Sequence, residues 1–204
     1  AGDPMIINKT LLLAQQHCVS VGAHPSYPDI SGFGRRLMTL PTSELIVIVQ
    51  YQIAALDGMA ANLGIQLDYV KPHGALYNDM MIDATIRAAA MRAVAEHYRP
   101  LVFMMQATGD AESHRREADA AGLEVLFEGF ADRCYDDQGR LVARSRAGAV
   151  HGRDQTLAQV TQLLKHNCVT PASGRRLPLQ IDSLCVHGDN LAAVEAIADI
   201  RRLI

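Results

Sequence analysis

Three histidines each follow a short apolar run and open a polar loop. They are His24, His73 and His187, and the apolar runs before them end at residues 21, 70 and 186. Imidazole titrates near neutral pH and is the commonest metal ligand, so each ring is suited to moving protons or binding a divalent metal ion. A lone histidine is more often structural, but three at matching positions indicate a site. We therefore predict that all three belong to a functional site, and they are the candidate ligands if a metal binds there.

Aspartates accompany the histidines on the same predicted rim, at Asp29, Asp132 and Asp189. Histidine combined with aspartate suits proton transfer at an amide or metal-assisted hydrolysis. The sequence contains no H-E-x-x-H motif or similar spacing, so a metal-dependent and a metal-free mechanism both stay open.

The segment 71–78, with the sequence K-P-H-G-A-L-Y-N, concentrates functional groups at a strand-to-helix turn. Gly74 allows the backbone to approach another group closely. Lys71 could act as an electrophile or hold an anion, but it could equally be a solvated lysine. Tyr77 and Asn78 are candidate substrate contacts, although packing explains a tyrosine here at least as well.

Further candidate substrate contacts lie outside that segment. Arg133 could bind a substrate carboxylate through two parallel hydrogen bonds, or it could form an ion pair with the neighbouring Asp132. His24, Tyr27 and Asp29 share one long loop and are the remaining candidates. Loops of that length are usually functional or disordered.

The elements that position these loops can be predicted from the apolar pattern. Helices are expected at 5–16, 42–62, 83–97, 110–122, 154–165 and 190–203, and strands at 18–21, 67–70, 101–105, 123–127 and 183–186. A turn at 136–139 predicts a hairpin that joins 133–135 to 141–143. Short apolar strands that alternate with helices indicate a parallel sheet covered by helices, which is an α/β fold.

The predicted polar clusters all follow the C-terminal ends of strands. A βα barrel builds its site from many such loops, whereas an open doubly wound sheet concentrates its ligands at one switch point. Because five strands contribute polar residues, we favour an irregular βα barrel. Eight βα units typically need about 250 residues, so the 204 residues predict a short or truncated barrel that forms a single domain over 1–204.

The beginning of the sequence supports that expectation. After Ala1 and Gly2, Asp3 is placed to cap a helix whose first position is Pro4. A helix in a βα protein follows a strand, so we expect that a first strand precedes this helix and is absent from the sequence.

Composition excludes several classes of protein. The apolar content of 49% and the charged content of 20% are those of a globular chain, and the net charge of -3 gives no electrostatic case for binding nucleic acid or an anionic membrane. No apolar run approaches the roughly 20 residues of a membrane span. The 4 cysteines form no C-x-x-C pair, which favours reduced thiols and a cytoplasmic location. No phosphate-binding glycine motif for ATP or a dinucleotide is present.

Several motifs together resemble one family. They are G-A-H-P-S-Y-P-D at 22–29, G-F-G-R-R at 32–36, Y-Q-I-A-A-L at 51–56, V-K-P-H-G-A-L-Y-N at 70–78, F-A-D-R at 130–133, R-S-R-x-G-A-V at 144–150 and C-V-H-G-D at 185–189. In this order they resemble the LamB/YcsF family over nearly the whole chain. That family normally opens with an acidic D-L-N-x-D-x-G-E segment and an N-x-A-C-G-x-H segment, neither of which is present here, and Ser26 replaces a family glycine.

The resemblance implies an irregular βα barrel related to glycoside hydrolase and deacetylase barrels. It implies the ATP-dependent hydrolytic opening of 5-oxoproline to glutamate, by a chain that acts together with 5-oxoprolinase subunits B and C. ATP, with Mg, would be shared with those partners. Arg133 or Lys71 would hold the substrate carboxylate, and His73 and His187, with Asp132 or Asp189, would move protons or activate water at the lactam carbonyl.

Two other interpretations stay open. The chain could be a metal-dependent deacetylase-like hydrolase, which the barrel and the His/Asp rim suggest. It could also be a non-catalytic subunit that presents 5-oxoproline to its partners. A homo-oligomer is compatible with each interpretation.

Overall fold

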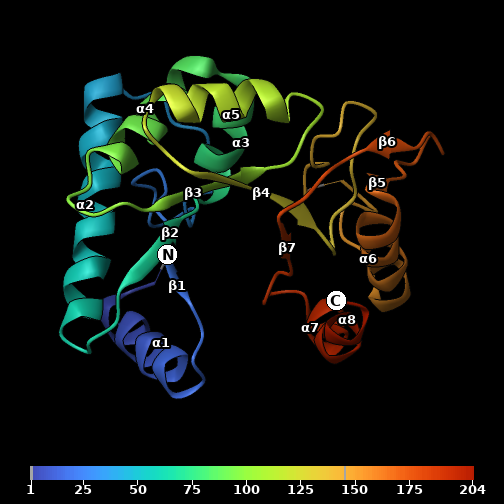
Figure 1. Ribbon diagram of the computed structural model, residues 1–204, viewed down its shortest axis with the longest axis horizontal. Helices are drawn as coiled ribbons and strands as arrows, with labels where there is room; N and C mark the ends of the chain where they lie inside the picture. Colours follow the sequence, from blue (N-terminus) through green and yellow to red (C-terminus); the bar gives the residue numbers. More distant parts are fainter. Residues whose placement is uncertain (1, 145) are drawn as a thin grey trace. The chain divides into compact units, whose positions relative to one another are not determined.

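Helices and strands alternate along the computed structural model, which describes residues 2–144 and 146–204 (Figure 1). The helices are α1 (Pro4–Gln16), α2 (Thr42–Ala61), α3 (Gly74–Ile82), α4 (Ala84–Ala95), α5 (Ala111–Ala120), α6 (Arg153–His166), α7 (Leu191–Glu195) and α8 (Ile197–Leu203). The strands are β1 (Val21–Ala23), β2 (Leu67–Val70), β3 (Val102–Gln106), β4 (Val125–Phe130), β5 (Cys168–Val169), β6 (Leu177–Pro178) and β7 (Ser183–Cys185). Ala1 of the opening segment and Ser145 of the R-S-R-x-G-A-V motif lie outside the described residues.

The chain divides into two compact units. The first unit comprises Ala1–Met105 and Arg115–Val125, and the second unit comprises Gln106–His114 and Leu126–Ile204. The chain passes from one unit to the other within β3, α5 and β4. The prediction of a single domain over 1–204 therefore stays a prediction.

The main sheet has the strand order β1-β2-β3-β4-β7, and the pairs β1–β2, β2–β3 and β4–β7 are parallel. Backbone hydrogen bonds join the segments of β3 and β4 within each unit. Phe103 donates to Glu124 within the first unit, and Ala107 donates to Glu128 within the second. The predicted α/β fold with a parallel sheet is confirmed. Its five strands form an incomplete βα barrel, since a closed one has eight.

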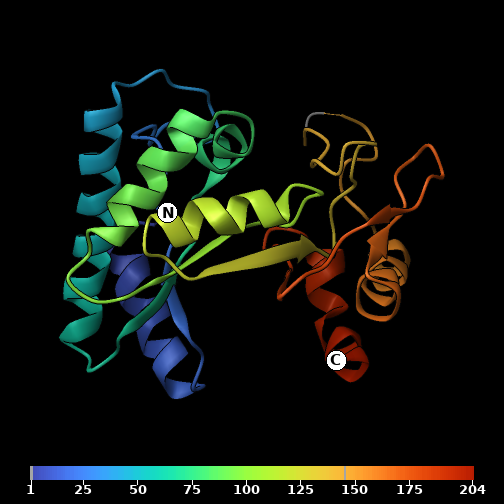
Figure 2. The same cartoon turned by 45° about the horizontal axis from the view of Figure 1, so that its top comes forward.

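Helix α2 covers the sheet of the first unit, where it packs against β1, β2 and α4 (Figures 1 and 2). By length and composition α2 could cross a membrane, although its 20 residues include Glu44 and Asp57 and so form no uninterrupted apolar run. Length and composition alone are weak evidence, because core helices meet the same limits. On the buried face of α2, Asp57 accepts hydrogen bonds from Tyr98 and Arg99. These contacts are those of a helix packed in an α/β unit.

The core of the second unit forms between α6 and the last two helices. Ala131, Val160, Ala196 and Ile200 are buried together there. The short antiparallel pair of β5 and β6, which the apolar pattern did not predict, also packs on α6 through β5.

The predicted first strand at 18–21 starts too early. Cys18 has a left-handed φ of 52°, and the backbone N–H of Val19 bonds back to Ala14, so these residues terminate α1 rather than extend a strand. At its other end α1 begins as predicted, because the Asp3 side chain caps it and Pro4 occupies the first turn. The strand β2 matches its predicted bounds.

Three other predicted elements differ from the structure. The strand predicted at 123–127 is displaced to 125–130, because residues 128–130 continue the ladder with β7. The closing helix is two helices that meet at Ala196. In the predicted hairpin Tyr135 does bridge Leu141, but Arg133 bridges Val150 instead.

Candidate functional site

The first unit brings His24 and His73 into direct contact. His24 follows β1, and His73 immediately precedes α3. The Nδ1 atom of His73 lies 2.9 Å from Nε2 of His24, and their ring centroids are 4.7 Å apart. Each outer nitrogen faces a backbone carbonyl. His24 Nδ1 is 2.6 Å from the carbonyl oxygen of Lys71, and His73 Nε2 is 2.8 Å from that of Phe33.

Burial governs the protonation of both rings. It is the largest cause that lowers the pKa of His24 to about 3, and the neighbouring His73 lowers it further. Burial also lowers the pKa of His73, while the bond to the Phe33 carbonyl partly opposes that shift. A buried imidazole loses water that would stabilise its charged form, so protonation is disfavoured at each ring taken singly.

The two histidine loops are locked together at a pair of glycines. The backbone N–H of Ala75 donates to Gly34 over 2.9 Å, and that of His73 donates to Pro25 over 2.8 Å. Gly74 has a φ of 64°, and a Cβ added there would lie 2.3 Å from the carbonyl oxygen of Gly34. Only glycine fits both the left-handed backbone and the close approach. The loop contacts thus fix one histidine relative to the other.

Tyr27 and Asp29 of the same loop make internal contacts. The Tyr27 hydroxyl donates to Asp79 Oδ2 over 2.9 Å, and this tyrosine is only 2% exposed. Burial and the Asp79 carboxylate both raise the pKa of Tyr27. Asp29 accepts hydrogen bonds from the Arg36 guanidinium, which lowers the pKa of Asp29 to about 2. In this arrangement both side chains support the loop.

The other candidates on the 71–78 segment differ in exposure. The Lys71 ammonium lies 5.8 Å from the centre of the Tyr77 ring, and Tyr77 is buried in α3. Asn78 is exposed on the same helix. The structure therefore places Tyr77 as packing under Lys71, and it leaves Asn78 accessible.

The second unit assembles a dyad from Asp132 and His187. Asp132 follows β4 and is fully buried, and its Oδ1 accepts a hydrogen bond from His187 Nδ1 over 2.8 Å. Asn190 Nδ2 donates to the second carboxylate oxygen over 3.2 Å. Burial alone would raise the pKa of Asp132, but the bonds and charge of His187 and the bond from Asn190 outweigh burial and lower it. An ionised carboxylate therefore fixes the His187 tautomer with its proton on Nδ1.

Arg133 lies next to the dyad in sequence but bonds to backbone carbonyls. Its Nη2 donates to Val142 over 2.7 Å and its Nε donates to Ala149 over 3.3 Å. Burial is the main cause that lowers the pKa of Arg133, and repulsion from Arg144 is the next. The guanidinium braces the loop between β4 and α6, and nothing in these contacts tests its predicted role toward a substrate.

Asp189 is bonded to an arginine. Its Oδ2 accepts from Arg144 Nη1 over 3.0 Å, and its side chain is 48% exposed. In neither unit do three or more His, Cys, Asp or Glu side chains of the described residues gather as a metal-binding group. The three candidate metal ligands are thus divided between a histidine pair and a His–Asp dyad.

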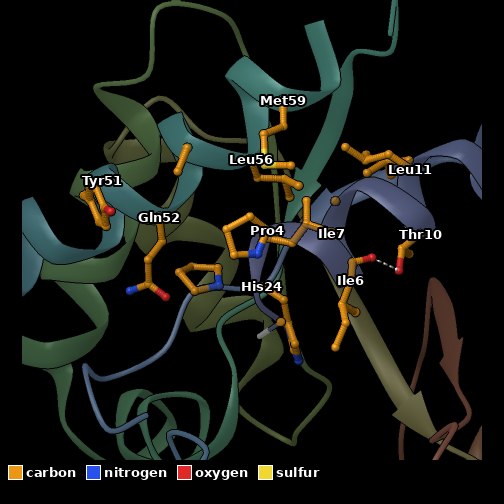
Figure 3. A pocket seen from close by; sticks show the side chains of 15 residues that line it. Pro4, Ile6, Ile7, Thr10, Leu11, His24, Tyr51, Gln52, Leu56 and Met59 are labelled. Atoms are coloured by element: carbon orange, nitrogen blue, oxygen red, sulfur yellow. Dashed lines mark hydrogen bonds between the residues drawn. The ribbon is translucent and has the colours of Figure 1, made fainter. Parts of the chain in front are cut away.

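A pocket of about 370 Å³ lies in the first unit between α1, α2 and β1 (Figure 3). Its lining is mainly apolar, with Ile7 and Leu11 from α1 and Leu56 and Met59 from α2. His24 also lines it. The described residues that line it include no Asp, Glu, Lys or Arg, so they offer no charged group for a small polar acid.

Sequence reasoning missed three polar side chains that shape these clusters. Asn190 was predicted only as the start of a helix, and it contacts Asp132 while its Oδ1 caps α7. Gln159 donates to the carbonyls of Phe130 and Arg133, which fixes the turn that carries Asp132. Asp79 receives the Tyr27 bond. Their positions on or at the start of a helix did not indicate a buried contact, because a polar residue there is usually solvated.

Comparison with known proteins gives consistent results over the whole chain. The profile of the LamB/YcsF family matches residues 1–204. A protein from Pseudomonas fluorescens (strain Pf0-1), named as the A subunit of 5-oxoprolinase, is 45% identical over 203 residues, which cover 99% of this chain and 81% of that protein. A protein of the same name from Chromohalobacter salexigens is 47% identical over 202 residues, or 98% of this chain and 81% of its own length.

A solved structure shows the same fold. The crystal structure of a lactam utilization protein from Thermus thermophilus superposes with a TM-score of 0.88 at 32% identity, over 99% of this chain and 81% of that one.

Proposed function

We propose, from the premise that this chain belongs to the LamB/YcsF family, that it opens 5-oxoproline to L-glutamate as the A subunit of an ATP-dependent 5-oxoprolinase. The names of its relatives support a role in 5-oxoproline and lactam metabolism and in an enzyme of several subunits. We further propose that subunits B and C are the partners and that the assembly is cytoplasmic.

The Asp132–His187 dyad carries this proposal. With its proton held on Nδ1 by Asp132, neutral His187 presents a lone pair at Nε2, and the ring is partly exposed, at 23%. A general base of this kind removes a proton from water as the water oxygen adds to the lactam carbonyl carbon. The buried carboxylate then stabilises the imidazolium that forms, as in other His–Asp arrangements.

Substrate recognition needs a cation for the carboxylate of 5-oxoproline. Arg133 is our candidate, since its guanidinium is held rigidly by two carbonyls beside the dyad residue Asp132. Lys71 is the second candidate. We assign the exposed Asn78 to substrate contact, and we assign supporting roles to Tyr27, Asp29 and Tyr77, which are buried.

Nucleotide chemistry is proposed to be shared with the partner subunits. The sequence lacks a phosphate-binding glycine motif, so MgATP would be bound largely by subunits B and C. This chain would supply the groups that bind the lactam and activate water.

The test is glutamate formation from 5-oxoproline and ATP by this chain mixed with purified subunits B and C. We expect turnover with the parent chain and a loss of about 10²-fold or more with His187→Gln. The relative from P. fluorescens, in place of this chain, serves as the control for competent partners. Glutamate formation with that relative but not with this chain would reject the proposed function, and full activity of His187→Gln would remove the dyad from it.

A further inference from the structure

The guanidinium of Arg133 is buried without a carboxylate bonded to it. Arg133 is only 7% exposed, and its Nε and Nη2 atoms donate to the backbone carbonyls of Ala149 and Val142. Among the described residues, Nη1 makes no hydrogen bond, and the adjacent Asp132 is bonded to His187 instead. Burying a cation is costly unless an anion pairs with it. The buried guanidinium therefore has room and need for an anion at Nη1.

Arg144 brings a second positive charge close to the first. The carbonyl of Val142, which accepts from Arg133 Nη2 over 2.7 Å, precedes Arg144 by two residues. Burial first, and then the charge of Arg144, lower the pKa of Arg133, so the two guanidiniums lie close enough to repel each other. Arginine binds carboxylates and phosphates through two parallel hydrogen bonds. An anion between these two side chains would remove the repulsion.

Asp189 holds Arg144 in place. Its Oδ2 accepts from Arg144 Nη1 over 3.0 Å, with a longer contact of 3.5 Å from Nη2 to Oδ1. Asp189 follows His187 by two residues, so one loop carries both the dyad histidine and the group that restrains the arginine. The Arg144 side chain is 29% exposed, which leaves it accessible to a ligand from solvent.

Three chain segments of the second unit are tied together by these contacts. The bonds that tie them join Asp132 to His187, Arg133 to Val142, and Arg144 to Asp189. All six residues lie within Leu126–Ile204, so the arrangement depends on the second unit alone. It connects both guanidiniums to the loops that form the dyad.

We infer that Arg133 and Arg144 together bind the carboxylate of the lactam substrate, and that Asp189 is a positioning residue that holds Arg144 toward it. The inference rests on the proposed function for the identity of the substrate, but the anion site itself does not. It extends the assignment of Arg133 to a pair of arginines. It also gives Asp189 a role other than the proton transfer that its place in the sequence suggested.

The balance of charge favours a carboxylate over a phosphate. The two arginines supply two positive charges, and Asp132 and Asp189 supply two negative charges. A carboxylate adds one negative charge and matches the planar fork of a guanidinium. A phosphate group at neutral pH carries nearly two negative charges. Repulsion from the two aspartates therefore selects the ligand of lower charge.

The anion site is tested on the chain alone, by NMR of the arginine Nε–H groups during addition of 5-oxoproline. We expect the Arg133 and Arg144 signals to shift. Arg144→Gln should weaken binding by about 10- to 100-fold, because a charged hydrogen-bond donor is lost. Pyrrolidinone, the same lactam ring without a carboxylate, should shift neither signal. Arg140→Gln is the matched control, since this arginine is bonded to Asp136 on an exposed turn, and it should leave the affinity unchanged.

Three results of this experiment would contradict the inference. An Arg144 signal that does not respond to 5-oxoproline, or a chain that does not bind 5-oxoproline, would overturn the anion site. Equal affinity of Arg144→Gln and the parent chain would also overturn it. Inorganic phosphate that binds more tightly than 5-oxoproline at the same two signals would overturn the choice of a carboxylate.

The positioning role is tested in the enzyme assembled with subunits B and C. Asp189→Asn should raise KM for 5-oxoproline by about 3- to 10-fold and leave kcat nearly unchanged, because Arg144 loses the charge that restrains it. Asp189→Glu keeps that charge and should recover most of the loss. A merely structural role would not be rescued in this way. A fall of kcat at unchanged KM, or no change in either, would overturn the positioning role.

The two experiments separate this inference from the proposed function. If the chain binds 5-oxoproline through both arginines but releases no glutamate with competent partners, the anion site stands and the function is rejected. Glutamate release with a KM that Arg144→Gln leaves unchanged would do the reverse.

Discussion

The buried carboxylate of Asp132 offers the sharpest test of the dyad. Asp132→Asn changes one oxygen to an amide group with almost no change in volume. The carboxylate now accepts from His187 over 2.8 Å and from Asn190 over 3.2 Å. An amide can accept only through its oxygen, so either His187 or Asn190 must face an N–H donor. If that donor faces His187, the ring proton moves to Nε2 and the base is lost.

The expected magnitudes follow from these contacts. Loss of the correct tautomer should lower kcat by about 10²- to 10⁴-fold, the range for removing an oriented base and for the corresponding change in a Ser-His-Asp triad. Stability should fall by about 1–3 kcal/mol, because one hydrogen bond to a buried charged group is lost and one donor is left unpaired.

The assays are glutamate release with the partner subunits and urea unfolding of the isolated chain. Asp154→Asn is the matched control, since its side chain is 98% exposed in the first turn of α6. The control should change the free energy of unfolding by no more than about 0.5 kcal/mol, and it should leave kcat nearly unchanged. Loss of stability in Asp132→Asn with full kcat would refute the assignment of His187 as a base held by Asp132, and a purely structural role would remain.

Three further predictions concern the first unit. Gly74→Ala should lower the free energy of unfolding by about 1–3 kcal/mol, because the added Cβ would lie 2.3 Å from a carbonyl oxygen. Gly109→Ala is the control and should have little effect, because the space around its Cβ is open. Equal urea midpoints for the two variants would contradict this prediction. Arg99→Ala should lower the urea midpoint, because Asp57, 4% exposed, loses its guanidinium partner, and unfolding at high salt should hardly reduce that loss. Lowering the pH from 6.5 toward 3 should reduce the free energy of unfolding, by about 2 kcal/mol at pH 4.5. The reason is that His24 takes up a proton in the unfolded chain, whereas in the folded chain its pKa is lowered to about 3. A urea midpoint that does not change over that pH range would refute the shift.

Much of the fold could be predicted because its signals are local. The strand β2 matched its predicted bounds, since a short apolar run ends at a proline motif. The strand β4 was displaced because its last residues include Glu128 and Gly129, which no local propensity marks as strand. Their pairing with β7 is a contact between residues far apart in sequence. Tertiary pairing of this kind overrides local preference.

The candidate site was predictable in its residues but not in its pairings. The three histidines could be selected because each ends an apolar run. That His24 would meet His73, and that His187 would meet Asp132, depends on loop conformations fixed by backbone contacts such as Ala75 to Gly34. Asp189 was an equal candidate by sequence, but the structure bonds it to Arg144.

The side-chain amide of Asn190 joins two roles in one group. Its oxygen accepts from the backbone of Ala193 and so starts α7, while its nitrogen donates to Asp132 and to the carbonyl of His151. A fluctuation that frays the first turn of α7 therefore also removes a donor from the buried carboxylate. Fraying of α7 and loss of the Asn190 hydrogen bond to Asp132 are therefore coupled. Hydrogen exchange at the start of α7 then reports how often the Asp132–His187 dyad loses this donor.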